Sequence, residues 1–354
     1  MTAHPSEVER PPRNRSQQVL LGLGALVLAA LPHGIPEFYT GLVTSGLIAA
    51  MLALSLQLLV GCTGLVSLGH AAFYGLGAYT VYAITPADHS LSVLATLPAA
   101  AAVAGLAALM VGALSLRTRG FFFLMVTLAF GQMVFFIFHN TKLGGGADGA
   151  YLLRPSFSLF DWQLPLTRRQ RPLAHYYLAL ILLLAMYLGL HLLLRSLFGR
   201  VLQGIRVNEG RMLALGFNTY RYKLAAFAIA GLLAGIAGHM YAMKEGFVNP
   251  ELVGWHRSAE ALLMILLGGL TTLSGPIIGA LAYTAIGEVA QLITERKLLV
   301  EGLVILLVVL CLPKGLIGGL SGALSAIAAP RWPPRWLPRR RPPARPPSEA
   351  PRHG

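Results

Sequence analysis

The side chains that could catalyse a reaction form no recognisable enzyme pattern in this sequence. None of its ten histidines occurs in an H-E-x-x-H arrangement, so a zinc-protease site is excluded. There is no G-x-S-x-G nucleophile elbow, and none of the five lysines follows the phosphate-binding P-loop pattern. We therefore expect no metal site, no cofactor and no enzymatic activity. Any ATP chemistry must come from another polypeptide.

Acidic residues are scarce in the apolar parts of the chain. Only Glu260, Glu288 and Glu301 fall within or beside long apolar runs. Ionisable groups inside a membrane are costly and are usually retained for function. All three lie near the ends of these runs, which gives little support to a proton relay.

The composition indicates a membrane protein. Of 354 residues, 55% are hydrophobic and 12% are charged, whereas soluble domains carry about 25% charged residues. The mean hydropathy of +0.65 agrees. A net charge of +14 would suggest nucleic acid binding by a soluble protein, but here it is expected to orient the chain in a lipid bilayer, and no nucleic acid partner is expected.

The apolar runs predict an all-α integral membrane protein with about ten transmembrane helices, eight to ten in all, and with broken Gly-rich segments. Each run approaches the length needed to cross a core of about 30 Å. The first could instead be an interfacial helix, and residues 271–276 could form a re-entrant turn. The expected spans are 19–35, 38–60, 65–84, 91–116, 121–138, 174–194, 223–243, 258–272, 276–293 and 298–312.

Basic residues predict the orientation. With both termini in the cytoplasm, the inner segments hold three, two, six and eight of the 28 Lys and Arg residues, as the positive-inside rule favours. The expected organisation is a cytoplasmic tail (1–18), a polytopic membrane domain (19–318) and a Pro/Arg-rich, disordered cytoplasmic tail (319–354). Within the membrane domain, an outer loop is expected at 139–173 and an inner loop at 195–222.

The inner loop at 195–222 predicts a short amphipathic helix between two spans. Arginines precede an apolar set that contains Leu213 and Leu215, and Gly216 is a helix stop. Such a helix would project as a knob that can dock into a groove of a soluble partner. The alternative is a plain, positively charged loop.

Two glycine-rich interruptions, one in each half of the chain, point to a substrate path. Broken backbone is tolerated at membrane depth only where protein or a water-filled cavity satisfies it. Close helix packing is the alternative, and it is favoured for Gly75, Gly77 and the Gly231/Gly235 pair. His70 could line the path or could be a hydrogen-bonded packing residue. The candidate path residues are Gly61, Gly64, Ser67, Gly69, His70, Gly268, Gly269, Gly275 and Pro276.

The expected outer loop contains a glycine-rich turn that could act as a hinge, a docking loop or a simple turn. Consecutive glycines beside an aspartate suit a tight, exposed backbone. The length of the whole loop suggests an outer partner or a gate. The candidate residues are Gly144, Gly145, Gly146, Asp148 and Gly149.

In order and spacing, the motifs resemble the LivM-type permease subunits of branched-chain amino acid ABC importers. The resemblance spans about residues 38–318. The motifs are GLVSLGHAAFYGLGAY (64–79), TLAFGQ (127–132), GGGADG (144–149), the segment 198–242, GFVNPE (246–251), EALLMILLGGLTTLSGPIIGA (260–280) and EGLVILLVVLCLPKGL (301–316).

The resemblance implies a non-hydrolysing subunit of the bacterial cytoplasmic (inner) membrane. Its implied partners are a second related permease, two cytoplasmic ATP-binding subunits and an extracytoplasmic solute-binding protein. The implied substrates are branched-chain or other hydrophobic amino acids. The resemblance also implies that the ATPase-coupling residues are Arg206, Asn208, Glu209, Ala214 and Gly216.

Other functions remain open at this stage. A permease for urea or short amides is the nearest alternative. An ion-coupled secondary transporter would be expected to carry more buried carboxylates and to work without ATPase partners. A membrane enzyme acting on lipid would need a cluster of His, Asp or Glu at one membrane face.

Overall fold

The computed structural model of the chain describes most of the expected membrane domain. The expected tails 1–18 and 319–354 lie outside the described residues, as does most of the expected span 298–312, whereas most of the expected span 19–35 is described. The described residues are 22, 24, 26–86, 91–156, 158–159, 162–163, 167, 170–270, 272–293, 296, 299–300, 302–303, 306–307 and 315–316.

The described part is almost entirely helical, which confirms the predicted all-α class. A chain in lipid must satisfy its backbone groups internally, and a helix does so within one segment. Five described helices of 20 to 27 residues are long and apolar enough to cross a membrane. They are α2 (Glu37–Thr63), α4 (Val93–Ser115), α5 (Phe121–Asn140), α6 (Gln170–Arg195) and α9 (Thr219–Glu245).

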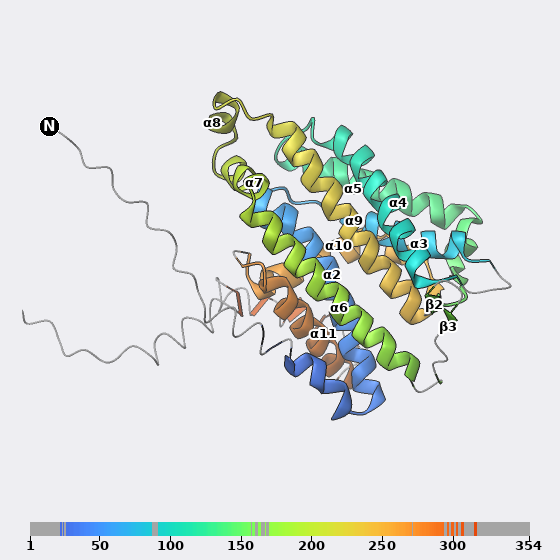
Figure 1. Ribbon diagram of the computed structural model, residues 1–354. Helices are drawn as coiled ribbons and strands as arrows, with labels where there is room; N and C mark the ends of the chain where they lie inside the picture. Colours follow the sequence, from blue (N-terminus) through green and yellow to red (C-terminus); the bar gives the residue numbers. More distant parts are fainter. Residues whose placement is uncertain are drawn as a thin grey trace, which may run out of the picture.

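Shorter elements complete the described structure (Figure 1). The helices are α3 (His70–Ile84), α7 (Leu197–Val207), α8 (Glu209–Ala214), α10 (Trp255–Gly268) and α11 (Gly275–Ile293), with 3-10 turns η1 (Leu31–His33), η2 (Leu143–Asp148) and η3 (Pro250–Leu252). Two antiparallel strand pairs are present. They join β1 (Ala150–Tyr151) to β4 (Phe247–Val248), and β2 (Ser158–Leu159) to β3 (Trp162–Gln163).

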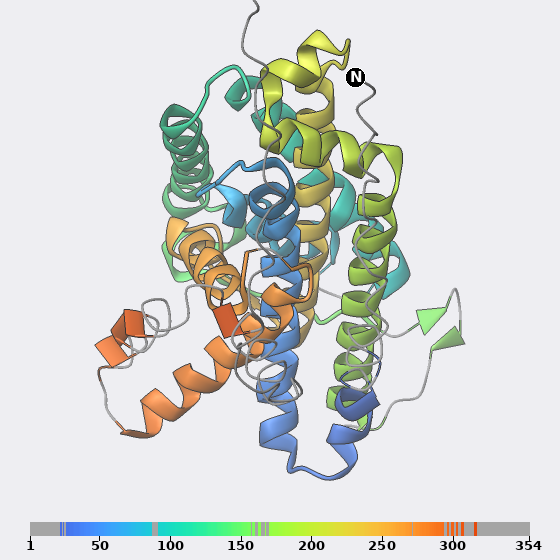
Figure 2. The same ribbon diagram turned by 90° about the vertical axis from the view of Figure 1, so that its left-hand side faces the viewer.

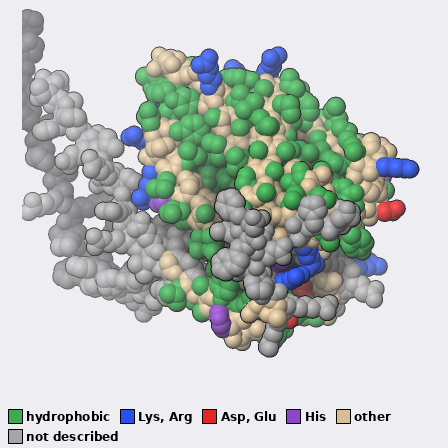
Figure 3. Space-filling view, turned by 45° about the vertical axis from the view of Figure 1, so that its right-hand side comes forward, with side chains coloured by type: hydrophobic (Ala, Val, Ile, Leu, Met, Phe, Trp, Pro, Cys, Tyr) green, Lys and Arg blue, Asp and Glu red, His purple; other side chains and the backbone are tan. Residues whose placement is uncertain are grey.

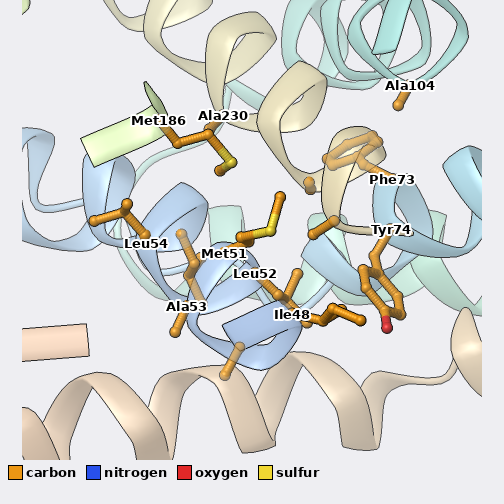
Figure 4. Close-up of a cluster of buried hydrophobic side chains, with 14 of the residues drawn as sticks. Ile48, Met51, Leu52, Ala53, Leu54, Phe73, Tyr74, Ala104, Met186 and Ala230 are labelled. Carbon is orange, nitrogen blue, oxygen red and sulfur yellow. The ribbon is translucent and has the colours of Figure 1, made fainter. Parts of the chain in front are cut away.

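Helix α2 forms the centre of the bundle. Its most apolar stretch is 83% buried, against 17% for that of α5, so α5 lies at the periphery. Helices α6, α9, α10 and α11 all contact α2. Figure 4 shows Ile48, Met51 and Leu52 of α2 in one buried cluster with Phe73 of α3 and Met186 of α6.

The outer helices present apolar side chains to their surroundings, as expected for contact with lipid or another membrane subunit. Figure 3 shows one face covered mainly by hydrophobic side chains, with Lys and Arg near its edges. The exposed residues include Leu106 and Met110 of α4, Phe122 of α5, and Ile181 and Leu188 of α6.

Small residues allow α3, α4 and α9 to pack closely. A β-carbon at Gly77 would overlap the backbone of Gly235, and β-carbons at Gly231 and Gly235 would overlap side chains of α4. The packing interpretation of these glycines is therefore confirmed. Close approach of this kind stabilises helix pairs in lipid, where no hydrophobic force drives helices together.

The expected spans from 38–60 to 223–243 correspond to helices α2–α6 and α9. The main difference is at the expected span 65–84, because α3 begins only at His70. The expected span 258–272 overlaps α10. Helix α10 has 14 residues and α3 has 15, so each extends about 21–23 Å, which is shorter than a hydrocarbon core of about 30 Å.

Gly238 offers a test of the packing between α3 and α9. A β-carbon there would overlap the carbonyl oxygen of Tyr74, and a backbone atom cannot move aside as a side chain can. Overpacking usually costs about 1–3 kcal/mol, so we expect Gly238→Val to lower the thermal unfolding midpoint of the purified chain by about 1–4 °C.

Gly189→Val on α6 is the matched control, because no atom lies within 4 Å of its β-carbon position. Thermal unfolding in detergent followed by intrinsic fluorescence measures both variants. Equal midpoints for the two variants would contradict the proposed packing.

Candidate coupling knob and translocation path

Residues 197–216, which we call the knob, project beyond the ends of α2, α6 and α9 (Figures 1 and 2). The sequence predicts one short amphipathic helix here, and the structure contains two, α7 and α8. Val201, Leu202 and Ile205 of α7 are buried, whereas Arg200 is exposed, so α7 is amphipathic. The alternative of a plain loop is therefore wrong.

The tip of the knob is apolar and exposed. Helix α8 has no buried residue. Val207 is 84% exposed, and Leu213 and Leu215 are also exposed. The chain then turns away from the helix at Gly216, whose φ of +87° favours glycine. Exposed apolar side chains next to arginines suit a surface that docks on another protein.

Asn208 and Glu209 fix the knob to the rest of the chain. The Asn208 side chain accepts a hydrogen bond of 2.9 Å from the backbone N–H of Arg211, which caps α8. Glu209 forms an ion pair of 2.6 Å with Lys223 of α9 and accepts a 3.0 Å hydrogen bond from the hydroxyl of Thr219. The predicted coupling residues Asn208 and Glu209 therefore position the knob.

The pKa of Glu209 lies below its ordinary value. Partial burial raises this pKa, but the hydrogen bonds from Lys223 and Thr219 outweigh burial and lower it. A carboxylate with a lowered folded-state pKa contributes stability above its unfolded-state pKa of about 4.3 and loses it as the pH falls through the folded value. The contact is therefore fully formed at neutral pH.

Arg206 joins the knob to α2, because its guanidinium donates a hydrogen bond to the carbonyl oxygen of Gly61. Gly61 is a predicted path residue and Arg206 is a predicted coupling residue, so the structure brings one residue of each set into contact. Ala214 is the last residue of α8.

The first interrupted segment is residues 64–69. Gly64 ends α2 with a φ of +74°, and α3 starts at His70. Ser67 is buried, and a β-carbon at Gly69 would overlap the carbonyl oxygen of Thr127 in α5. The sequence-based prediction of a broken segment is confirmed, and the break is held against α5.

His70 has the surroundings of a packing residue. Its side chain is fully buried, its Nε2 lies 2.8 Å from the Ser55 hydroxyl, and its ring meets that of Phe73 edge-on at 5.8 Å. The Ser55 hydroxyl donates to the carbonyl oxygen of Leu52, so Nε2 of His70 is the donor to Ser55. These contacts agree with the packing alternative.

The second interrupted segment is the turn that joins α10 to α11. Helix α10 starts beside the middle of α3, where Gly75 packs on Val253 and the N–H of Ala71 donates to the Ser258 hydroxyl over 2.8 Å. Helix α11 then runs beside α2 toward the beginning of α2 (Figure 2). Gly268, Gly269 and Gly275 form this turn, and Pro276 lies in the first turn of α11, where its missing N–H has no cost.

Gln57 of α2 holds this turn in place. Its side-chain amide donates to the carbonyl oxygens of Leu270 at 2.8 Å and Thr272 at 3.4 Å. A β-carbon at Gly61, one helical turn further along, would lie 2.5 Å from the Gln57 nitrogen. Glycine at position 61 therefore leaves the space that this amide occupies.

Buried polar atoms near both interruptions have no hydrogen-bond partner among the described residues. Buried polar groups normally have a hydrogen-bond partner, so water or a passing ligand would supply the missing hydrogen bonds. They are the side-chain oxygens Gln57 Oε1, Ser67 Oγ and Thr272 Oγ1, and the ring nitrogen His70 Nδ1.

The outer glycine-rich segment forms a tight, anchored turn. Gly144, Gly145, Gly146 and Gly149 all have positive φ. A β-carbon at Gly144 would overlap the Tyr79 ring. The turn leads into β1, which pairs with β4, and Asp148 is exposed. The predicted loop is therefore held against α3 and the end of α9.

A charged cavity was missed by the sequence analysis. It has a volume of about 410 Å³ and lies between α2, α3, α9, α10 and α11. Glu260 and Glu288, which the sequence treats as separate residues near span ends, both line it together with Arg257. None of the predicted path residues is in its described lining. The charges of Arg257, Glu260 and Glu288 in or beside apolar runs were the signal available in the sequence.

The cap on α8 gives a direct test of the knob. Removing an N-cap side chain usually costs about 0.5–2 kcal/mol. We therefore expect Asn208→Ala to accelerate hydrogen–deuterium exchange of amides 209–215 by about 2- to 30-fold at pH 7, with no change in α7. Ser92→Ala, at the cap of α4 and away from the knob, is the control: it should leave the exchange of α8 unchanged. Unchanged exchange of α8 in Asn208→Ala would contradict the capping role.

Comparisons with known proteins agree with these features. The family described as "Branched-chain amino acid transport system / permease component" matches residues 38–310. The high-affinity branched-chain amino acid transport permease LivM of Escherichia coli is 31% identical over 84% of this chain and 75% of its own length. LivM of Salmonella typhimurium is 30% identical over the same shares.

A more distant relative covers only part of the chain. The autoinducer 2 import permease LsrC of Klebsiella pneumoniae is 35% identical over 33% of this chain and 34% of its own length. No solved structure matches the chain. The family match over most of the chain, the LivM relatives and the apolar helices agree with one another. The chain therefore belongs to the family of branched-chain amino acid transport permease components, and it is a multi-pass inner-membrane permease subunit of an ABC importer.

Proposed function

We propose that this chain carries branched-chain or other hydrophobic amino acids across the inner membrane. A second, related permease completes the path, two cytoplasmic subunits hydrolyse ATP, and an external solute-binding protein delivers the ligand. The names of the LivM relatives support the substrate class. The observation that carries the proposal is the knob, whose exposed apolar tip suits a groove on a soluble partner.

The proposed orientation places the knob and both termini in the cytoplasm. Lys and Arg gather at the knob end of the described bundle, as the positive-inside rule favours. These residues are Arg117, Arg119, Arg195, Arg200, Arg206, Arg211, Arg221 and Lys223. The anchored turn at 144–149 then faces outward, where exposed Asp148 is available to the solute-binding protein.

The two interrupted segments form part of the proposed path. The unpartnered atoms of Gln57, Ser67 and Thr272 support this role, because they offer hydrogen bonds at membrane depth. Gly61, Gly64 and Gly69 on one side, and Gly268, Gly269, Gly275 and Pro276 on the other, would shape the backbone there.

Helix α2 offers a route from the knob to this path. Arg206 of the knob binds the carbonyl of Gly61, and Gln57, one turn away, binds the turn after α10. A displacement of the knob by the ATPases would thus reach both interruptions through one rigid helix. ATP and ligand must bind the two access states with different affinity, since equal affinity would shift nothing.

Reconstitution of the complete importer tests the proposed function. Liposomes containing both permeases and both ATPases should accumulate leucine when the loaded binding protein is outside and ATP is inside. A hydrolysis-deficient ATPase should abolish uptake. Uptake of urea or acetamide in place of leucine would identify the alternative ligand class. Uptake by this chain alone under a proton or sodium gradient would refute the proposal.

The apolar tip of the knob gives the second test. A carboxylate at Leu213 or Leu215 would have to be desolvated in the docked complex, which costs several kcal/mol. We therefore expect the double substitution Leu213→Asp/Leu215→Asp to reduce co-purification of the ATPases by about tenfold or more. Arg117→Asp adds a carboxylate on the same face, outside the knob, and should leave co-purification unchanged. Retention of the ATPases by the double variant would exclude the knob as their docking site.

A further inference from the structure

The charged cavity lies on the opposite half of the molecule from the knob. Ser45 of α2, Glu245 at the end of α9 and Glu288 near the end of α11 all line it. A second hollow of about 650 Å³ shares Ser45, Lys244 and Glu288 with it and continues to Glu37 at the start of α2. With the knob in the cytoplasm, the cavity therefore opens toward the outer side.

The charges of the cavity are of both signs. Arg257 donates to Glu260 over 2.9 Å, and Lys244 pairs with Glu245 over 2.6 Å. Glu288 forms no ion pair within the described residues. The cavity thus has three carboxylates and two cations, and one carboxylate is available. These side chains are only partly buried, and those of Arg257 and Glu245 are each 41% exposed, so the charged set is open to a ligand that enters from the aqueous side.

Arg257 has unused binding capacity. A guanidinium carries five N–H donors in a fork that matches a carboxylate. Its described side-chain contact is the hydrogen bond to Glu260 through one nitrogen. Tyr74 and Tyr241 also line the cavity, with ring centres 5.9 Å apart. The Tyr74 ring lies beside Ile48 at the edge of the buried cluster (Figure 4).

The rest of the wall is aliphatic. Leu42, Ile48, Ala49, Leu52 and Met264 line the same cavity. Its volume falls within the usual range of about 300–1,000 Å³ for small-molecule sites, which combine apolar walls with a few placed polar groups. The two kinds of wall suit a small molecule that has charged groups at one end and an aliphatic group at the other.

We propose that this cavity is an outward-facing subsite for a zwitterionic aliphatic amino acid. Arg257 binds the ligand carboxylate, Glu288 binds the ammonium group, and the aliphatic wall receives the side chain. The excess carboxylate favours a ligand with an ammonium group over urea or a neutral amide. This inference rests on the proposed function and adds the point at which the chain itself selects the ligand.

Substitutions in the reconstituted importer test the subsite. At subsaturating loaded binding protein, Arg257→Met and Glu288→Gln should each reduce leucine uptake by about tenfold or more, because each leaves a ligand charge unpaired. Arg257→Lys, which keeps the charge without the fork, should retain more uptake than Arg257→Met. ATP hydrolysis stimulated by the binding protein should stay within about twofold of wild type in all three.

Matched controls are Arg195→Met and Glu251→Gln, two exposed residues outside the cavity, which should leave uptake unchanged. Uptake within twofold of wild type in both cavity variants would refute the subsite alone. Parallel loss of uptake and ATP hydrolysis in Arg257→Lys would also refute it, since that pattern indicates a structural role. Failure of the wild-type importer to take up leucine would refute the proposed function as well.

Cysteine accessibility gives a readout independent of transport. Ser45→Cys is made in a chain with Cys62→Ala and Cys311→Ala and is reacted with a cationic thiol reagent from outside, without binding protein. Leucine should slow the reaction by about tenfold at saturation. Isocaproate, which lacks the ammonium group, and isoamylamine, which lacks the carboxylate, should protect much less. Equal protection by all three, or absence of protection by leucine, would overturn the proposal.

Discussion

Backbone groups at membrane depth need partners within the protein, and the two interrupted segments are where this constraint is hardest to meet. The structure meets it largely through α2. Gln57 satisfies two carbonyls of the turn between α10 and α11, and Gly61 makes room for that amide. The carbonyl of Gly61 in turn accepts the guanidinium of Arg206. Two successive turns of α2 therefore connect the knob with the turn between α10 and α11.

This arrangement explains why α2 is so deeply buried. A helix that contacts α6, α9, α10 and α11 cannot move independently of them. Small residues bring α3, α4 and α9 together around it, and dense packing transmits displacement with little loss. The apolar faces of α4, α5 and α6 remain available to lipid or to the second permease.

Much of the fold could be predicted from the sequence. Apolar runs fix most of the long helices to within a few residues, because the length of such a run must match the bilayer. Glycines predicted both interruptions and the close packing at Gly77 and Gly235. The knob was predicted from its amphipathic pattern and from the stop at Gly216. These are local signals, each carried by a few neighbouring residues.

The depth of a helix in the membrane and the contacts between residues far apart in the sequence could not be predicted in this way. Hydropathy reports the length of an apolar run but not where the run lies in the membrane, so the depth that α10 reaches could not be predicted. Arg206 and Gly61 are 145 positions apart, and Glu260 and Glu288 line one cavity because α10 and α11 pack against each other. The role of His70 was left open, and its contacts with Ser55 and Phe73 favour packing.

We propose that the ATPases displace the knob and that the inner end of α2 transmits this displacement to the path. Gln57→Leu keeps the bulk of the side chain and removes its hydrogen bonds to the turn, so it tests this link most directly. In the reconstituted importer we predict that the number of leucine molecules moved per ATP hydrolysed falls by about tenfold or more while ATP hydrolysis continues. An unchanged ratio of leucine to ATP in this variant would contradict the account.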